Sequence, residues 1–324
     1  MPNPQRSILA AVTLFFLAPL VAEYLLGDFP LTWLPLIIVL APMYGGGAIV
    51  IRELARRSHR GWPTILLLGV AYAIIEEAFT TQSLFNPHYL GMHLLSHAWI
   101  PVLGTGAWWT LFMLNVHPFW SIGVSIALVD GLYPSRTRTP WLGNIGLSVA
   151  VALFAVGIIY NTSYSLHHDR FRASAAQLIV STLLVVVFAA AAFLIPPPAP
   201  SRHPSPAPSP WIIGGVTFLL GAAVFLSPIL WDWGAVVIIL GVDLVFLVGL
   251  GLFSQCSAWT PLHTFSIGAA GALVYGVHAF LQGPVVPSRK WIVLASHVLF
   301  LVLALAVVAA GTRRTRESMA RETA

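Results

Sequence analysis

The adjacent acids Glu76 and Glu77 are the residues of this sequence that most need a chemical explanation. Both lie within LLLGVAYAIIEEAFTTQSLFNP, part of an apolar stretch long enough to cross a lipid bilayer. An ionised carboxylate near the centre of a membrane helix costs roughly 2.5 to 3.5 kcal/mol, so each one needs a partner, a proton or a water-filled cavity. The pair therefore predicts catalytic or ion-binding chemistry inside a membrane.

The polar residues around the pair divide into two faces of the expected helix. Glu76 shares its face with Tyr72, Thr80 and Ser83, and Glu77 shares its face with Thr81. Because adjacent residues of a helix lie about 100° apart, the two acids are not expected to face one spot. We predict that Glu76 faces a polar cavity and that Glu77 orients it or pairs with it.

A histidine lies at a matching depth in the next apolar stretch. His117 is about 15 Å and Glu76 about 13 Å from the same predicted membrane surface, at about 1.5 Å per helical residue. Pro118 lacks a backbone donor and so loosens the helix beside His117. Further polar residues fall in or near the same half of the membrane, and they predict a shared polar layer: Asp243, His278, Gln282 and His297.

Each of these residues also has a purely structural interpretation. A membrane histidine is commonly a neutral hydrogen-bonding group between helices, which applies to His278 and His297. A protonated, hydrogen-bonded Asp243 needs no further role. The structural interpretation is weakest for the two adjacent glutamates, because together they double the cost of insertion. Glu23 and Asp130 lie near helix ends, where interface water reaches them, and they are assigned no chemistry.

The composition places these residues in a membrane protein. Of the 324 residues 58% are hydrophobic and 8% are charged, whereas soluble domains are about half apolar and about a quarter charged. The 16 basic residues are spread over short loops, so no patch suits a nucleic-acid backbone. The single cysteine, Cys256, excludes an internal disulfide and a cysteine-based zinc cluster. Fifteen arginines against one lysine are typical of a GC-rich bacterial genome, and the predicted location is the inner membrane.

Apolar runs bounded by charge, proline or glycine predict an all-α bundle of about ten membrane-spanning helices. The predicted spans are 8–26, 31–51, 63–85, 107–130, 142–161, 173–195, 211–230, 234–253, 265–282 and 291–310. With the N-terminus in the cytoplasm, twelve of the sixteen basic residues fall on the cytoplasmic side and four fall outside. This bias predicts that both termini are cytoplasmic.

The stretch 196–210, PPPAPSRHPSPAPSP, divides the chain into two groups of helices. Its prolines lack N–H donors and favour polyproline II geometry, so it is predicted to be a cytoplasmic linker. It separates a first bundle of six helices, residues 1–195, from a second group of four helices with a basic tail, residues 211–324. Six and four helices do not make the equal repeats of many transporters. The outer loop 86–106 is too polar to be another span.

Two resemblances follow from these motifs. The run YGGGAIVIRELARR, followed by GW and EEAFTTQSLFNP, resembles a group of uncharacterised multi-pass membrane proteins from bacteria over most of the first six spans. A second resemblance is to the CAAX-protease and bacteriocin-processing family of intramembrane metalloproteases, which carry EExxxR, FxxxH and HxxxN or HxxxD on successive helices. The first resemblance implies no activity, and the second implies metal-dependent hydrolysis within the membrane.

The match to the metalloprotease motifs departs at one position in each. Glu76 and Glu77 match the first motif, with Thr81 in place of its arginine. His117 matches the second motif, with Met113 in place of its phenylalanine. His278 and Gln282 give HxxxQ in place of the third, much further along the chain than in that family.

Three functions are compatible with the sequence. The first is a zinc-dependent hydrolase in which His117 and His278 bind the metal, Glu76 is the general base and Glu77 supports it. The second is a proton- or cation-coupled transporter that uses Glu76, His117 and Asp243. The third is a membrane scaffold in which all these residues serve packing. The sequence names neither a substrate nor an oligomeric state, and the lipid bilayer is the one partner it predicts.

Overall fold

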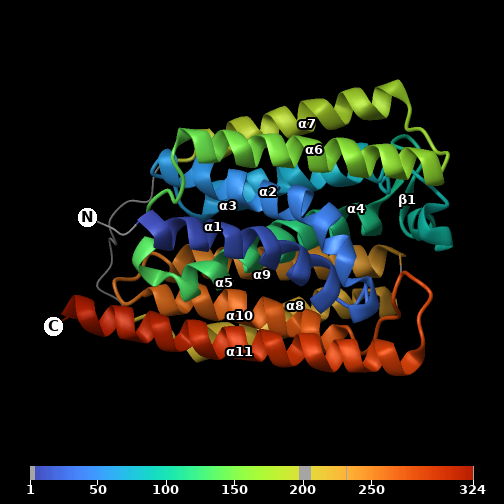
Figure 1. Cartoon of the computed structure of the whole chain (residues 1–324). Helices are drawn as coiled ribbons and strands as arrows, with labels where there is room; N and C mark the ends of the chain where they lie inside the picture. Colours follow the sequence, from blue (N-terminus) through green and yellow to red (C-terminus); the bar gives the residue numbers. More distant parts are fainter. Residues whose placement is uncertain (1–3, 197–205, 231, 324) are drawn as a thin grey trace.

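The protein, described by a computed structural model over residues 4–196, 206–230 and 232–323, is a bundle of long helices (Figure 1). Nine helical segments of this described part are long and apolar enough to cross a membrane. A tenth helix, Pro261–His278, is rich in glycine and alanine and is largely buried against its neighbours. The chain is an all-α, multi-pass membrane protein, which confirms the predicted fold class.

The long helices follow one another back and forth through the bundle (Figure 1). Those of the first bundle are α1 (Pro4–Pro19) with η1 (Leu20–Leu25), η2 (Leu31–Leu36) with α2 (Ile37–Arg57), α3 (Trp62–Ile74) with η3 (Ile75–Thr80), α4 (Ala107–Asn115) with η6 (Val116–Val124) and α5 (Ser125–Leu132), α6 (Asn144–His168) and α7 (Ala175–Leu194). The remaining four are α8 (Pro210–Leu226) with η8 (Ser227–Leu230), α9 (Asp232–Phe253), α10 (Pro261–His278) and α11 (Lys290–Thr323).

The loops carry short elements. Between η3 and α4 lie η4 (Tyr89–Gly91), η5 (Leu94–Ser96) and a hairpin of β1 (Trp99–Ile100) and β2 (Thr105–Gly106), so the predicted outer loop contains no span. A further turn of helix, η7 (Pro134–Arg136), follows α5. Helix α1 begins and α11 ends at one end of the bundle, here called the terminal end, and the hairpin lies at the other, the hairpin end (Figure 1).

The two predicted groups of helices pack against each other. Helices α10 and α11 contact α5, and α9 contacts α4. Most of the predicted linker, residues 197–205, lies outside the described residues. Arg57 ends α2 and Arg136 ends η7, and both elements finish at the terminal end of the bundle. The predicted topology places these two arginines on one side of the membrane in the same way. That this side is the cytoplasmic one stays a prediction.

Helix α2 is the centre of the first bundle because three consecutive glycines, Gly45 to Gly47, bring three other helices close to it. An added Cβ would overlap the backbone of Phe15 in α1 at Gly45, press on Phe154 in α6 at Gly46, and press on the Tyr72 ring in α3 at Gly47. Small residues allow such close approach of membrane helices. The glycine run thus places Tyr44, the residue before it, between the helices that carry the acids.

A buried charged network closes the terminal end of the first bundle. Arg52 is fully buried, and its guanidinium bonds Asp130 Oδ1 from Nη2 at 2.9 Å and Nε at 3.1 Å and lies 3.3 Å from the centre of the Trp141 ring. Glu53 accepts the backbone N–H of Trp141 at 2.6 Å. A charge confined in this way needs several partners, since removal from water is costly. Arg52 and Asp130 therefore tie α2 to α5, a role that the interpretation of Asp130 as a residue at a wet helix end did not include.

We expect Gly45→Ala to lower the free energy of unfolding by about 1–3 kcal/mol, because the methyl group has no room against the α1 backbone. The matched control is Gly241→Ala in α9, where nothing lies within 4 Å of an added Cβ. Thermal unfolding in one detergent compares the two variants. Equal unfolding temperatures for both would contradict the close packing of α1 on α2.

Candidate functional site

Glu76, Glu77 and His117 meet inside the bundle and form what we call the Glu–Glu–His cluster. His117 Nε2 lies 2.7 Å from Glu77 Oε1, and His117 Nδ1 lies 3.2 Å from Glu76 Oε2. The imidazole therefore stands between the two carboxylates, with one carboxylate at each ring nitrogen. No more than 4% of any of the three residues is exposed. One ligand atom from each lies within 4.8 Å of the others, as binding of a single metal ion requires.

The two glutamates thus reach the same side chain, contrary to the expectation from a 100° step. Two features of the structure explain the difference. Glu76 and Glu77 lie in η3, which is a π-helix, so its turns are wider than those of an α-helix. The flat ring of His117 also offers nitrogen atoms on two edges, so the two carboxylates need not point to one spot. Glu77 is consequently as close to the histidine as Glu76.

The helix ends at Thr80, which changes the predicted polar face. Ser83 lies beyond this end and donates a hydrogen bond to Glu77 Oε2, not to Glu76. Thr81 donates to the same oxygen at 3.0 Å. Thr80 turns to Thr162 of α6, at 3.2 Å between hydroxyl oxygens. The prediction that Ser83 and Thr80 lie on the face of Glu76 was therefore wrong, because it assumed a regular helix that continues to residue 85.

Each of the π-helical segments in the described part of the chain carries an ionisable residue of this region. They are η1 with Glu23, η3 with the glutamate pair, and η6 with His117. In η6 the missing N–H of Pro118 interrupts the α-helical bonding, and an added Cβ at Gly69 of α3 would press on the Pro118 backbone. π-Helical turns are rare and occur frequently at functional sites. Their coincidence here marks the cluster as the candidate site.

Tyr44 links the cluster to a third acid, Glu23. The Tyr44 hydroxyl oxygen lies 2.5 Å from Glu76 Oε1 and 2.6 Å from Glu23 Oε1. Neither residue was predicted from the sequence. Glu23 was set aside as a residue near a helix end, and Tyr44 is one aromatic residue among many. Two sequence features could have drawn attention to them. Pro19 ends α1 shortly before Glu23, and the glycine run follows Tyr44 directly.

The cluster holds more acid than base. No lysine or arginine pairs with Glu23, Glu76 or Glu77 in the described part of the chain, and His117 is the basic group that contacts the pair. Glu76 Oε2 and the Tyr72 hydroxyl are buried and lack a hydrogen-bond partner among the described residues. Buried polar atoms are normally paired, so these two fit a site that accepts a ligand.

The loop between η3 and α4 covers the cluster at the hairpin end. The indole of Trp109 donates to the Ser83 hydroxyl at 3.0 Å. Tyr89 of the loop packs on Trp109, and burial, with the nearby charge of Glu77, raises the pKa of Tyr89 well above its usual value. The backbone N–H of Ala98 donates to Asp232 at the start of α9, at 2.6 Å. The loop is therefore held from both sides of the bundle.

The structure does not bring the other predicted site residues into the cluster. His278 packs on Phe225, and Gln282 bonds Asp28 in the loop after η1. Asp243 accepts a hydrogen bond from Asn115 at 3.1 Å. His297 is buried beside Gly27 and Phe280. Among the described residues, none of these four contributes a ligand atom to the cluster.

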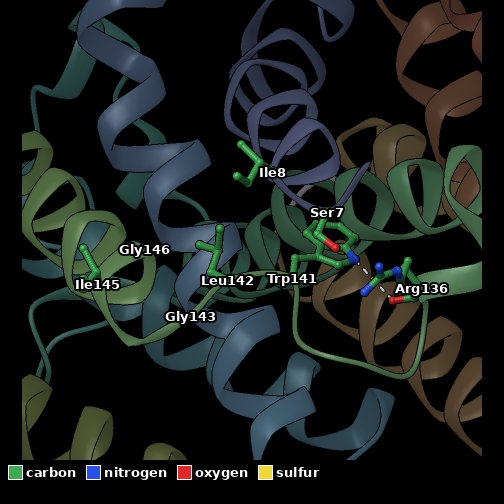
Figure 2. A pocket seen from close by; sticks show the side chains of 8 residues that line it. All are labelled: Ser7, Ile8, Arg136, Trp141, Leu142, Gly143, Ile145 and Gly146. Atoms are coloured by element: carbon green, nitrogen blue, oxygen red, sulfur yellow. Dashed lines mark hydrogen bonds between the residues drawn. The ribbon is translucent and has the colours of Figure 1, made fainter. Parts of the chain in front are cut away.

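A pocket of about 490 Å³ opens at the terminal end, and no residue of the cluster lines it (Figure 2). Its walls are the start of α1, the start of α6 and the segment between η7 and α6, with Trp141 and Arg136 at one side. Most of the lining is apolar, and the pocket lacks a convergent set of polar side chains of the kind that orients a ligand. It is therefore not the candidate site.

The chain matches the model of a protein family. It is an uncharacterized membrane protein family, and it matches residues 12–197, more than half of the 324 residues. The chain belongs to this family. The matched range includes the whole cluster with Tyr44 and Glu23, whereas Asp243, His278 and His297 lie outside it. No curated protein and no solved structure is significantly similar to the chain.

Family membership confirms the first resemblance and the multi-pass membrane location. The family description assigns no activity, and the resemblance to intramembrane metalloproteases stays a prediction.

We expect Ser83→Ala to lower the free energy of unfolding by about 1–3 kcal/mol, because both Glu77 and the Trp109 indole lose a buried partner. Ser163→Ala is the matched control, since the Ser163 hydroxyl is exposed and bonds its own helix at Ile159. Thermal unfolding in detergent measures both. A control as unstable as Ser83→Ala would contradict the assigned contacts.

Proposed function

We propose that the chain is a metal-dependent hydrolase that acts within the membrane, with the Glu–Glu–His cluster as its active centre. The observation that supports this proposal is that atoms of Glu77 and His117 able to bind a metal and a carboxylate oxygen of Glu76 lie within 4.8 Å of one another in a buried, polar site. Catalytic zinc sites commonly combine histidine and carboxylate ligands with an open position for water. The substrate class that fits this location is a peptide or ester bond presented within or beside the bilayer.

The chemistry of the donor set fits a divalent cation. Carboxylate oxygens and an imidazole nitrogen are ligands for zinc and for other first-row metals. The surplus of acid over base in the site favours a positive ion, because uncompensated charge is costly away from water. Glu76 Oε2 accepts no hydrogen bond from the described residues and lies 3.2 Å from His117 Nδ1, beside the residues that would hold the ion.

The residues divide the work as follows. Glu77 and His117 would hold the cation, and Thr81 and Ser83 orient Glu77 through its second oxygen. A bound divalent cation makes water nucleophilic at neutral pH and polarises the bond that is attacked. Glu76, beside these ligands, would accept a proton from the attacking water at Oε2 and return it to the leaving group. The loop over the cluster limits access of bulk water, which strengthens these interactions.

The proposed ligand set departs from the metalloprotease resemblance. That resemblance implies His278 as a second histidine ligand, and His278 lies outside the cluster, against Phe225. At the position of its arginine this chain has Thr81, which donates to Glu77. The proposal therefore rests on the geometry of the cluster and keeps from the resemblance only the class of reaction.

A second candidate is a proton- or cation-coupled transporter, favoured by one specific observation. Short polar contacts run without interruption from Glu23 through Tyr44, Glu76 and His117 to Glu77, across the elements η1, α2, η3 and η6. Such a series can carry protons between membrane helices. Uptake of protons by vesicles that contain the protein, abolished by Glu76→Gln, would favour this function over hydrolysis.

We expect the purified protein to bind one divalent ion, and Glu77→Gln or His117→Gln to lower its affinity at least about 100-fold. Metal analysis after dialysis against zinc, manganese or cobalt measures this. His278→Gln and Asp243→Asn are the matched controls, because both remove a membrane polar group outside the cluster, and they should keep the ion.

The same proteins, in liposomes with a quenched-fluorescence library of membrane peptides, test the reaction. Glu76→Gln should lower the rate about 10²–10⁴-fold. Metal binding that needs His278, or hydrolysis that survives chelation, would reject the proposed centre.

A further inference from the structure

We propose that the pocket at the terminal end binds an anionic phospholipid, with an acyl chain between α1 and α6 and the phosphate group at Arg136. The site is independent of the proposed hydrolase function, since no residue of the Glu–Glu–His cluster lines the pocket. It also gives a role to the basic end of α2, Arg52 to Arg57, which the hydrolase proposal does not use.

The pocket lies where two membrane spans begin. Ser7 and Ile8 lie near the start of α1, and Ile145 and Gly146 belong to the first turn of α6. Both helices are long and apolar enough to cross a membrane, so their first turns are expected at the level of the lipid headgroups. Phospholipids are therefore the molecules that surround the opening.

The walls of the pocket suit an acyl chain. Ile8 is 58% and Ile145 84% exposed, and Leu142 adds a third apolar side chain (Figure 2). No described atom lies within 4 Å of a Cβ added at Gly143, so the space beside its backbone is open. The few polar groups disfavour a polar substrate, whereas a hydrocarbon chain needs only apolar surface to be removed from water.

The position for the phosphate group is set by Arg136. Its backbone carbonyl accepts hydrogen bonds from Arg52 Nη2 at 2.7 Å and from the Trp141 indole at 3.2 Å. These contacts to the buried network fix the backbone of Arg136, and its side chain lines the pocket on the side of Trp141 (Figure 2). A guanidinium offers five N–H donors in a planar fork that matches the oxygens of a phosphate.

The charge around the pocket is positive. None of the eight described residues that line it is acidic, and the first turn of α6 contains no acid. Two carboxylates, Glu53 and Asp130, belong to the adjoining buried network, and both already pair with arginines of α2. Against these two acids stand four arginines, Arg52, Arg56, Arg57 and Arg136. Basic pockets of this kind between membrane helices bind anionic headgroups.

The apolar walls and the charge together favour one ligand. A free phosphate ion would use the arginine and leave the apolar walls exposed. A neutral lipid would cover the walls and leave the surplus positive charge without a partner. An anionic phospholipid answers both, because its acyl chain and its phosphate group are joined in one molecule.

Photolabelling of the full-length protein tests the location of the lipid. The protein is placed in phosphatidylcholine vesicles that contain phosphatidylglycerol with a photoreactive group in one acyl chain. We expect labelled peptides that contain Ile8, Leu142 or Ile145, because these side chains form the apolar walls. An excess of unlabelled phosphatidylglycerol should remove this label, and the same amount of phosphatidylcholine should not.

Two substitutions with matched controls test the two parts of the site. Arg136→Gln should weaken phosphatidylglycerol binding at least about fivefold. Arg138→Gln removes the same charge from an exposed residue of the same segment that does not line the pocket, and it should leave binding unchanged.

Gly143→Leu should abolish displaceable labelling, because its side chain would occupy the open space. Gly283→Leu, at an equally open loop position without a positive φ, is its control. Binding is measured from the unfolding temperature in detergent as phosphatidylglycerol is added, since a ligand of the folded state raises it.

Several results would overturn the proposal. Equal weakening by Arg136→Gln and Arg138→Gln would mean attraction to surface charge in general. Displacement by phosphatidylcholine, stabilisation by inorganic phosphate to the same extent, or displaceable label confined to other helices would each exclude the site. If Gly143→Leu does not fold, photolabelling of the unaltered protein decides.

Discussion

The cost of holding carboxylates away from water is the constraint on which this structure depends. Glu76 and Glu77 are tolerated because one imidazole, His117, stands between them and serves both. The rest of the first bundle can be understood from this contact. The glycine run of α2 draws α1, α3 and α6 together so that Tyr44 reaches Glu76, and the π-helical turns adjust the acids and the histidine to one another. Fold and site thus have one physical origin.

The sequence was sufficient for features that depend on position along the chain. Hydropathy predicted ten spans, of which nine correspond to helices of the described part that are long and apolar enough to cross a membrane, and the cost of buried charge singled out the glutamate pair. Depth, counted at about 1.5 Å per residue, correctly placed Glu76 and His117 in one layer. Pro118 pointed to an irregular helix beside His117, and a π-helix begins there at Val116. Each of these inferences uses local chemistry and the thickness of the bilayer, which a single sequence contains.

The side of a helix on which a residue lies, and so the neighbour that it contacts, could not be predicted in the same way. His278 and Asp243 were expected to share the layer of the cluster, yet they contact Phe225 and Asn115. Depth says nothing about which side of a helix faces which neighbour. The π-helical turns also rotate every residue that follows, so Glu77 and Ser83 moved away from the faces that a regular α-helix predicts. Tyr44 and Glu23 met only because α1 and α2 cross at Gly45.

The contact between Ala98 and Asp232 has a mechanical consequence. The loop that covers the cluster belongs to the part of the chain before the Pro-rich segment, whereas Asp232 begins a helix that follows it. The hydrogen bond therefore fixes the start of α9, which also packs on α4, to the loop that lies over Ser83 and Trp109. A helix that contributes no acid to the cluster thus helps to hold the loop that covers it.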